Sequence, residues 1–275
     1  MIKIGDSNFE WGKKTYVMGV LNVTPDSFAD GGLFFETSKA VEHAKQMAFD
    51  GADIIDIGGE SAKPGSEPIS EEEELNRVQP VIKELVKDGI SIPISIDTNK
   101  PAVAEKCLEV GARMVNDTTG LKDIDMARVV SQYRIPVVIM HMKGTPKTMQ
   151  ADPTYEDVVE EIKEFMRQRI KVAKEAGIQE VIIDPGIGFG KTTEHNLQIL
   201  KRLHEFQELG CPILIGTSRK SFIGNLTGGL PVTERLEGTL VSLAVAIMNG
   251  ANIVRVHDVK ETKRAIQVVD AIKYI

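Results

Sequence analysis

The sequence predicts an α/β fold, a single (β/α)8 barrel (a TIM barrel) spanning residues 1–275. Short apolar runs typical of buried strands occur eight times, and segments with helical periodicity separate them, which is the pattern of a parallel sheet with crossover helices. The length of 275 residues also suits one barrel domain. Nearly every run ends in polar residues that a buried core does not need, and barrel enzymes build their active sites at the carboxyl ends of the strands.

The polar residues at the strand ends are the first candidates for a functional site. The expected strands cover residues 16–22, 53–60, 92–98, 113–118, 136–142, 181–186, 212–220 and 253–258. Their carboxyl ends carry Asn22, Glu60, Asp97, Asn116, His141, Asp184, Lys220, Arg255 and His257. Because the carboxyl ends of parallel strands share one face of a barrel, we expect these side chains to converge there.

Two segments between the strands show their helical character most clearly. Residues 70–89 begin with Ser70 and have Glu73 three positions later, which is the spacing of a capping box, and an apolar stripe follows. Residues 154–177 carry a similar stripe and end at Gly177, a suitable left-handed terminator. Both stripes predict core packing and not a binding surface.

Three loops that follow strands are long and rich in glycine and proline: 22–32, 58–68 and 142–153. On a barrel they lie on the same face, and long loops in a compact domain are more often functional than idle. We expect the first two, after strands one and two, to be mobile lids over a substrate.

Composition excludes several classes of partner. The net charge of −7 provides no basic excess for binding nucleic acid or an anionic membrane. No apolar stretch is long enough to span a bilayer, and no secretory signal is evident. Cys107 and Cys211 form no CxxC motif, which favours reduced thiols in the cytoplasm. We therefore expect a cytoplasmic protein that acts on small molecules.

The glycine-rich segment 184–191 resembles known phosphate loops but matches none of them. A P-loop ending at Gly190 and Lys191 needs glycine at 185, where Pro185 stands, and Lys191 replaces the third glycine of a dinucleotide fingerprint. The segment is better interpreted as a tight turn that lets a ligand approach the backbone. A purely structural turn is the alternative.

Asp97, Asn116 and Asp184 end three different strands. Each alone is explained as a helix cap. Together in one barrel mouth they can hold a flat heterocycle with several N–H donors, such as an aminopyrimidinone edge, because carboxylates accept paired hydrogen bonds. Met140 or Met142 can supply an apolar face to such a ring, although either alone is explained as core.

Positive charge gathers after the last two strands, in residues 218–221 (SRKS) and at Arg255 and His257. A helix that begins near Ser221 adds free N–H groups, and anion sites after strands seven and eight recur in barrels. Ser218 or Ser221 acting only as a helix cap is the alternative. His141 has no second ligand at zinc spacing, so a hydrogen-bonded histidine is the better interpretation.

Motifs along essentially the whole chain resemble those of the dihydropteroate synthases of the folate pathway. They are MGVLNVTPDSFADGG, DIIDIGGES, ISIDT, ND at 116–117, MHMKGTP, DPGIGFGK, GTSRKSFIG and RVHDV, in the order of that family. The resemblance implies a transferase that condenses 6-hydroxymethyl-7,8-dihydropterin pyrophosphate with p-aminobenzoate. It further implies Mg²⁺ as cofactor, sulfonamides as inhibitors, and a homodimer formed through helices late in the chain.

The resemblance also implies roles for individual residues. The pterin site comprises Asp97, Asn116, Met140, Asp184, Phe189 and Lys220. The pyrophosphate site comprises Asn22, Arg255 and His257, with Asn22 also near the metal. The p-aminobenzoate site comprises Phe28, Ala62, Lys63, Pro64, Phe189, Lys220 and Ser221, with Phe28 and Asp30 in the first loop. The catalytic set is Asn22, Asp97, Lys220, Arg255 and His257.

One departure from the family lies in the second loop. The usual sequence S-T-R-P is replaced by Ser61, Ala62, Lys63 and Pro64. Ala62 lacks a hydroxyl, and Lys63 lacks the planar fork of arginine. We expect altered binding of p-aminobenzoate and of sulfonamides, with pterin binding unchanged.

The residues also agree with the chemistry of the family. No Ser-His-Asp or Cys-His arrangement is evident, and none is needed if pyrophosphate leaves before the amine attacks, because an arylamine is already unprotonated at neutral pH. Two rivals stay open at this point. One is a pterin-binding methyltransferase, which works with a corrinoid or zinc-thiol module that this chain lacks. The other is a catalytically silent pterin-binding protein.

Overall fold

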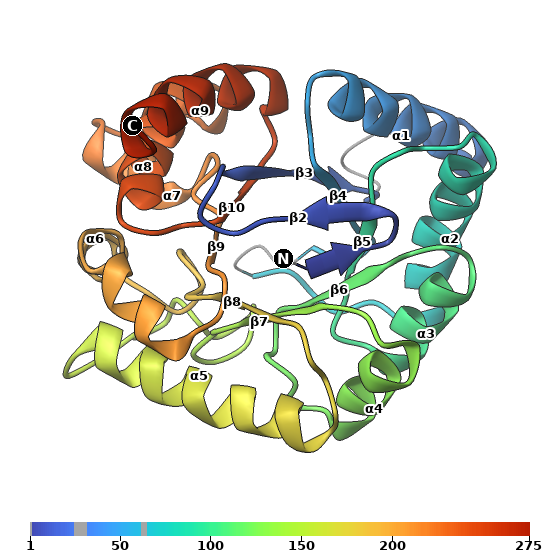
Figure 1. Cartoon of the computed structure of the whole chain (residues 1–275), viewed down its shortest axis with the longest axis horizontal. Helices are drawn as coiled ribbons and strands as arrows, with labels where there is room; N and C mark the ends of the chain where they lie inside the picture. Colours follow the sequence, from blue (N-terminus) through green and yellow to red (C-terminus); the bar gives the residue numbers. More distant parts are fainter. Residues whose placement is uncertain (1, 25–31, 62–64) are drawn as a thin grey trace.

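Eight parallel strands curve around a central axis, with helices on the outside (Figure 1). The computed structural model describes residues 2–24, 32–61 and 65–275. The strands are β3 (Tyr16–Asn22), β4 (Ile54–Gly58), β5 (Ile94–Asp97), β6 (Met114–Asp117), β7 (Val137–Met140), β8 (Val181–Asp184), β9 (Leu214–Ile215) and β10 (Ile253–Val256). They pair in the order β8-β7-β6-β5-β4-β3-β10-β9, and a parallel bridge from Ile183 to Ile213 links the two end strands. The predicted (β/α)8 barrel is confirmed.

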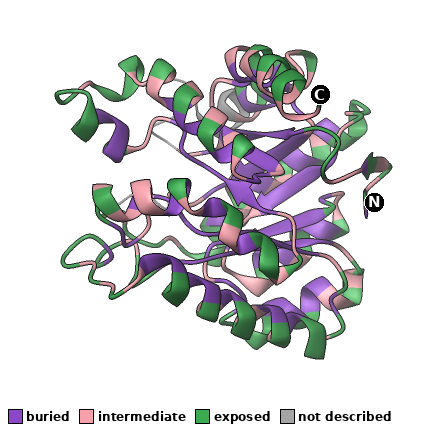
Figure 2. Cartoon of the chain, turned by 60° about the vertical axis from the view of Figure 1, so that its left-hand side comes forward, coloured by how far each residue is buried: buried purple, intermediate pink, exposed green. Residues whose placement is uncertain are grey.

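The helices surround the barrel with their buried faces toward it and their exposed faces outside, as the burial colouring of Figure 2 shows. They are α1 (Gly32–Phe49), α2 (Glu71–Lys87), α3 (Pro101–Glu109), α4 (Ile124–Tyr133), α5 (Val158–Glu175), α6 (Thr193–Lys201), α7 (Ser221–Leu226), α8 (Leu236–Met248) and α9 (Val259–Lys273), with 3-10 turns at Leu203–Leu209 and Val232–Glu234. None of the helices in the described ranges combines the length and apolar character needed to cross a membrane.

The two helices predicted most clearly are present, with different details at their amino ends. Ser70 accepts a hydrogen bond of 3.1 Å from the Glu73 amide, but the Glu73 carboxylate pairs with Arg77, so the reciprocal half of a capping box is not formed. The second helix begins later than predicted, because Asp157 caps it by accepting from the amides of Val159 and Glu160. Side-chain capping therefore fixes both starts.

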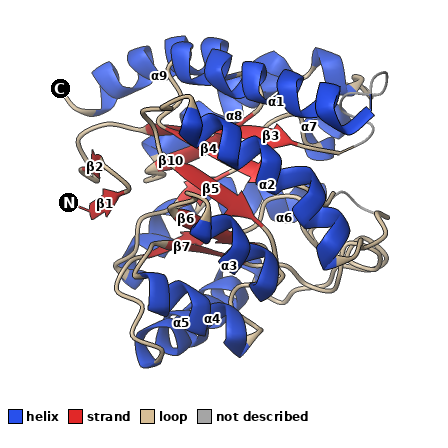
Figure 3. Cartoon of the chain, turned by 90° about the vertical axis from the view of Figure 1, so that its right-hand side faces the viewer, coloured by secondary structure: helices blue, strands red, loops and turns tan. Residues whose placement is uncertain are grey.

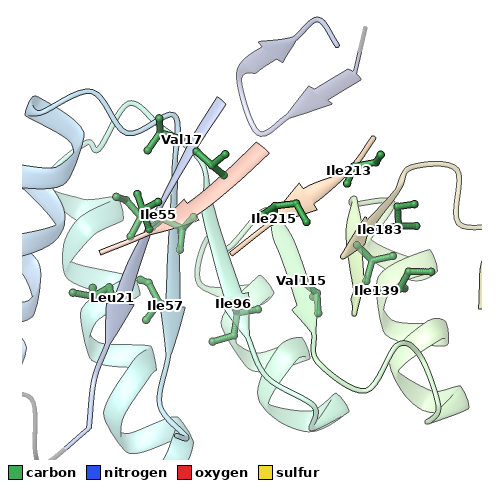
Figure 4. Packing of buried hydrophobic residues seen from close by; sticks show 14 of the residues in the cluster. Val17, Leu21, Ile55, Ile57, Ile96, Val115, Ile139, Ile183, Ile213 and Ile215 are labelled. Atoms are coloured by element: carbon green, nitrogen blue, oxygen red, sulfur yellow. The ribbon is translucent and has the colours of Figure 1, made fainter. Parts of the chain in front are cut away.

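Residues on each strand alternate between the barrel interior and the helices. The outward set packs beneath the helices and forms the main core, whose strand contribution is seen in Figure 4. It includes Val17, Leu21, Ile55, Ile57, Ile96, Val115, Ile139, Ile183 and Ile215. Burying each side chain of this size stabilises the fold by about 1.5–3 kcal/mol, which holds the strand ends in place.

A short antiparallel hairpin that the sequence did not predict, β1 (Ile2–Ile4) and β2 (Ser7–Phe9), covers the amino ends of the barrel strands (Figure 3). Its Ile2, Ile4 and Phe9 are buried against the lower interior layer. That layer consists of Tyr16, Met18, Ile54, Met114, Val138, Ile182, Leu214 and Ile253. The amino end of the barrel is consequently packed with side chains, and the polar interior positions lie toward the opposite end.

The loops after β4 and β7 touch each other across that opposite end. The Gly65 amide donates to the Pro146 carbonyl at 3.0 Å, and Lys147 pairs with Glu67 at 2.7 Å. The third long loop of the sequence therefore contacts the part of the second loop that the structure describes.

Candidate active site at the barrel mouth

A cavity opens at the carboxyl ends of the strands and gathers most of the predicted site residues. Those that line it are Asp97, Asn116, Met140, Asp184, Phe189, Lys220, Arg255 and His257. Val20, Thr118, Gly216 and Ser218, which the sequence analysis did not assign to the lining, complete it. The inward-facing parity of the strands produces this convergence, because Asp97, Asn116, Asp184 and Arg255 all sit at interior positions near their strand ends.

Arg255 lies between two carboxylates at the base of the cavity. Its Nε lies 2.6 Å from Oδ2 of Asp56, and one of its terminal nitrogens lies 2.6 Å from Oδ2 of Asp97. The Asn116 amide donates to the same oxygen of Asp56 at 2.9 Å. The sequence analysis missed Asp56, which is fully buried; a charged residue at an inward position of the run DIIDIGGE was the signal that could have identified it.

Burial dominates the electrostatics of this network. Desolvation raises the pKa of Asp97 to about 7, against the opposing effect of Arg255, and the charge of Asp56 raises it further. Burial lowers the pKa of Arg255, but Asp56 and Asp97 outweigh it, so the net shift is upward and the guanidinium stays charged. The second oxygen of Asp56 is buried without a hydrogen-bond partner among the described residues. The network that Arg255 forms with Asp56 and Asp97 therefore contains a carboxylate oxygen that the described donors do not satisfy.

Asp184 faces a second cation of the cavity lining, Lys220. Burial raises the pKa of Asp184, and Lys220 opposes that shift; the Gly186 amide also donates to Asp184 at 2.7 Å. Burial lowers the pKa of Lys220 to about 8. The Lys220 ammonium donates to the Ile187 carbonyl and lies 4.6 Å from the centre of the Phe189 ring. Asp184 and Lys220 thus form an acceptor and a donor beside one aromatic face.

An apolar cluster borders the polar groups. Met140, Met142 and Met149 are buried together, and Phe189 packs against them. Polarizable thioethers and a ring next to buried acceptors form a suitable surface for a flat heterocycle.

Ser218 and His257 form the corner that was predicted to bind an anion. Ser218 Oγ lies 3.0 Å from Nδ1 of His257, and the His257 amide donates to the same hydroxyl at 3.2 Å. Burial, with Arg255 next in importance, lowers the pKa of His257 to about 4. At neutral pH His257 is therefore a neutral hydrogen-bonding group, and the positive charge of this corner comes from Arg255 and Lys220.

Four predicted residues lie apart from the cavity lining. Arg219 turns to Asp258, with its Nε 3.0 Å from that carboxylate. Ser221 is the first residue of α7, and Asn22 stands at the end of β3, partly exposed. His141 bonds to Lys191 and lies in no group of potential metal ligands among the described residues.

Several predicted residues cannot be placed. Phe28, Asp30, Ala62, Lys63 and Pro64 lie outside the described residues. Among the residues that the structure does describe, no group of three or more His, Cys, Asp or Glu side chains could hold a metal ion.

The sequence and the structure both match known proteins. The family model described as "Pterin binding enzyme" matches residues 18–257. The dihydropteroate synthase of Clostridium beijerinckii is 49% identical over 275 residues, covering 98% of this chain and 99% of that protein.

Solved structures agree with this match. The enzyme of Clostridium difficile, solved with pteroic acid, has a TM-score of 0.91 at 48% identity and covers 96% of this chain and 99% of its own. That of Xanthomonas albilineans, solved with 4-aminobenzoic acid, has 0.89 at 44%, covering 95% and 94%. That of Yersinia pestis, solved with a sulfonamide drug complex, has 0.90 at 42%, covering 95% of each chain.

Proposed function

The chain belongs to the dihydropteroate synthase family, whose members are transferases of folate biosynthesis. From that premise we propose the reaction that it catalyses. It condenses 6-hydroxymethyl-7,8-dihydropterin pyrophosphate with p-aminobenzoate to give 7,8-dihydropteroate and pyrophosphate. The observation that carries the proposal is one cavity in which Asp97, Asn116 and Asp184 meet Lys220 and Arg255.

The pterin ring binds at the base of the cavity. Asp97, Asn116 and Asp184 offer acceptors to the N–H groups on its aminopyrimidinone edge, while Met140 and Phe189 cover its faces. Buried carboxylates with raised pKa values favour a ligand that brings donors, because each new hydrogen bond offsets part of their desolvation. This explains why the protein keeps carboxylates in a place where they are costly.

The pyrophosphate lies beside Arg255, His257 and Asn22. Mg²⁺ fits this corner, because the ion commonly takes one or two protein oxygens and completes its shell with substrate phosphates and water. The Asn22 side-chain amide, at the carboxyl end of β3, would supply the protein oxygen. When bound, Mg²⁺ neutralises charge on the leaving pyrophosphate.

Pyrophosphate departs before the amine attacks. The bond between the pterin methylene carbon and the phosphate oxygen breaks, and its electron pair leaves with the oxygen. Arg255 and Lys220 stabilise that growing negative charge, and His257 donates a hydrogen bond to it. Asp97 and Asp184 stabilise the cationic pterin methylene, and the amine nitrogen then forms the new bond and releases a proton. Every protein group acts by charge and position, so no covalent intermediate with the protein arises.

p-Aminobenzoate binds nearer the opening, with Phe189, Lys220 and the amino end of α7 at Ser221. Its remaining contacts belong to Phe28 and to residues 62–64 of the second loop. Our hypothesis is that Ala62 and Lys63 alter affinity for p-aminobenzoate and for sulfonamides. The double substitution Ala62→Thr with Lys63→Arg should shift the KM for p-aminobenzoate and the inhibition constant of a sulfonamide; unchanged values would refute the hypothesis.

The active form is a homodimer of a one-domain barrel, assembled through α7 and α8. Val241, Val245 and Met248 of α8 are exposed although they are apolar, as is Leu226 of α7. A helix that is apolar on nearly all sides is usually covered, and a second copy presents the same surface around a two-fold axis. We place the protein in the cytoplasm, because Cys107 and Cys211 are free thiols, which is typical of a reducing compartment.

One incubation tests the reaction. The full chain is mixed with the pterin pyrophosphate, p-aminobenzoate and Mg²⁺, and pyrophosphate and dihydropteroate are quantified together. Equal yields of both products are expected, with little turnover by Asp97→Asn. Ligand binding without turnover by the parent protein would instead support a silent pterin-binding protein. Methyl transfer from a methylated pterin, tested separately, would support the methyltransferase rival.

A further inference from the structure

Lys191 closes the glycine-rich segment 184–191, and the proposed chemistry does not use it. Its side chain is buried, with 2% of the residue exposed. Its Nζ lies 2.9 Å from Nδ1 of His141, 3.0 Å from the Phe189 carbonyl oxygen and 3.4 Å from the His141 carbonyl oxygen. A lysine ammonium has three donors, and these three acceptors match them. Lys191 is thus fully engaged without a carboxylate in salt-bridge contact among the described residues.

The segment is held from two sides by two lysines. Lys220 donates to the Ile187 carbonyl from the cavity side, and Lys191 donates to the Phe189 carbonyl from the side of the barrel wall. The backbone itself rests on the residues after β7. A Cβ atom at Gly186 would lie 1.9 Å from the His141 carbonyl oxygen, and one at Gly190 would lie 2.3 Å from the Lys143 carbonyl oxygen. Lys191 therefore fastens the turn that presents Phe189 to the layer that carries Met140.

The charge of Lys191 also lies close to Asp184. The Gly186 amide donates to Asp184 at 2.7 Å, and a Cβ on the same glycine would lie 3.4 Å from Nζ of Lys191. The charged groups that act on Asp184 are Lys220 directly before α7, Lys191 from the glycine segment and Arg255 from β10. His141 adds no charge, because burial lowers its pKa to about 2, and it accepts from Lys191 through Nδ1.

Burial and Asp184 act on Lys191 in opposite directions. Burial lowers the pKa of Lys191 well below its ordinary value; the charge of Asp184 offsets part of that shift, and the charges of Lys220 and Lys143 add to it. The reverse effect holds for Asp184, whose pKa Lys191 lowers. Each charge supports the other across the glycine turn.

We propose that Lys191 is a positioning residue of the pterin site, which fixes Phe189 through its carbonyl and provides Asp184 with a second positive charge beside Lys220. This inference rests on the proposed function only for the identity of the ligand. Lys191 thus has a geometric role, which is to fix Phe189, and an electrostatic role, which is to act on Asp184. A lysine that only fills space in the core is expected to have neither role.

The test observes Asp184 directly. The γ-carboxyl carbons of aspartate are labelled with ¹³C, the Asp184 signal is assigned by its loss in Asp184→Asn, and the unliganded full chain is titrated by NMR. In Lys191→Met the Asp184 midpoint should move to higher pH, because a positive charge is lost. In Lys191→Arg, which keeps the charge, it should stay near the parent value. Lys171→Met is the matched control: the Lys171 side chain is 76% exposed, pairs with Glu175 on α5, and is not among the charges that act on Asp184 or Lys191.

Kinetics test the geometric task. For Lys191→Met, kcat/KM for the pterin pyrophosphate should fall by up to about 100-fold, the loss that a displacement of about 1 Å can cause in a positioned site. Lys171→Met should retain the parent value. An unmoved Asp184 midpoint in a folded Lys191→Met protein would overturn the electrostatic task, and an unchanged kcat/KM would overturn the geometric one.

Two checks keep these outcomes interpretable. Near-ultraviolet circular dichroism shows whether each variant is folded, and should Lys191→Met not fold, Lys191→Gln, which keeps a donor but no charge, takes its place in both measurements. The NMR titration does not require turnover. A parent protein without synthase activity would therefore refute the proposed function while the shift of Asp184 still decided this inference.

Discussion

Asp97 should make the unliganded protein less stable as the pH rises. In the folded chain its pKa is about 7, compared with 3.8 for the ordinary group, because burial outweighs the attraction of Arg255. Between these two pH values the folded state binds more protons than the unfolded state. Stability is therefore lost as the pH rises from about 4 to 7, which is opposite to the usual behaviour of a salt-bridged aspartate.

The size of the effect follows from the two pKa values. Each factor of ten in proton affinity corresponds to about 1.4 kcal/mol. The difference between 3.8 and about 7 then makes ionised Asp97 cost the folded protein about 4 kcal/mol above pH 7. A typical domain has only about 5–15 kcal/mol of net stability, so this cost is large. Asp97→Asn, which is neutral at every pH, should avoid it.

Urea unfolding of the parent and of Asp97→Asn at several pH values between 4 and 8 measures this. The two proteins should be similarly stable near pH 4, and the variant should become more stable by about 4 kcal/mol near pH 8 while losing activity. Asp157→Asn is a control of opposite sign. Burial raises the pKa of Asp157, but Arg202 and the amides of Glu160 and Val159 together lower it further, so the stability that Asp157 contributes is present above its unfolded pKa. A stability difference between parent and Asp97→Asn that does not change with pH would refute the reasoning.

Three further outcomes are expected. Arg255→Lys keeps the charge but cannot bridge two carboxylates, so urea unfolding should show a loss of about 3–5 kcal/mol, the cost of a buried charge left without its partner; wild-type stability would contradict this. Gly186→Ala places a Cβ 1.9 Å from a backbone oxygen and should fold poorly. The control Gly228→Ala, at φ +75 with open space around it, should lose only the conformational strain energy of about 1–3 kcal/mol. Equal losses of stability in thermal unfolding would argue against the close contact at Gly186. Val241→Glu should give a monomer by light scattering while the fold is retained, and an unchanged mass would exclude this face from the dimer.

Much of the site was predictable because the alternation of inward-facing and outward-facing residues along a strand can be counted from the local sequence. Asp97, Asn116, Asp184 and Arg255 each occupy an inward position near the end of an apolar run, and parallel strands bring their carboxyl ends together. The same rule identifies Asp56 as an inward-facing residue, because it lies between the outward-facing Ile55 and Ile57. What parity cannot show is that Asp56 pairs with Arg255, a partner 199 residues away in the sequence.

Other features depend on contacts that have no sequence signal. The strands of the amino-terminal hairpin have three residues each, which is too short for a periodic pattern. His257 looks like a cation in the sequence, yet burial lowers its pKa to about 4. Lys191 looks like part of a phosphate loop, yet its ammonium points to His141 and Phe189. In each case tertiary burial, which a local pattern does not contain, decides the outcome.

The hairpin at the amino end limits the routes by which ligands can reach the interior of the barrel. With Ile2, Ile4 and Phe9 packed against the lower interior layer, that end offers no passage. Among the residues that the structure describes, the cavity opens only at the carboxyl end, so the reaction proposed above requires the pterin ring at its base to bind before the arylamine. An arylamine bound first at the opening would block the base of the cavity while the pterin site there is still empty. The proposed order of substrate binding at the carboxyl end of the barrel thus depends on the packing of the hairpin at the amino end.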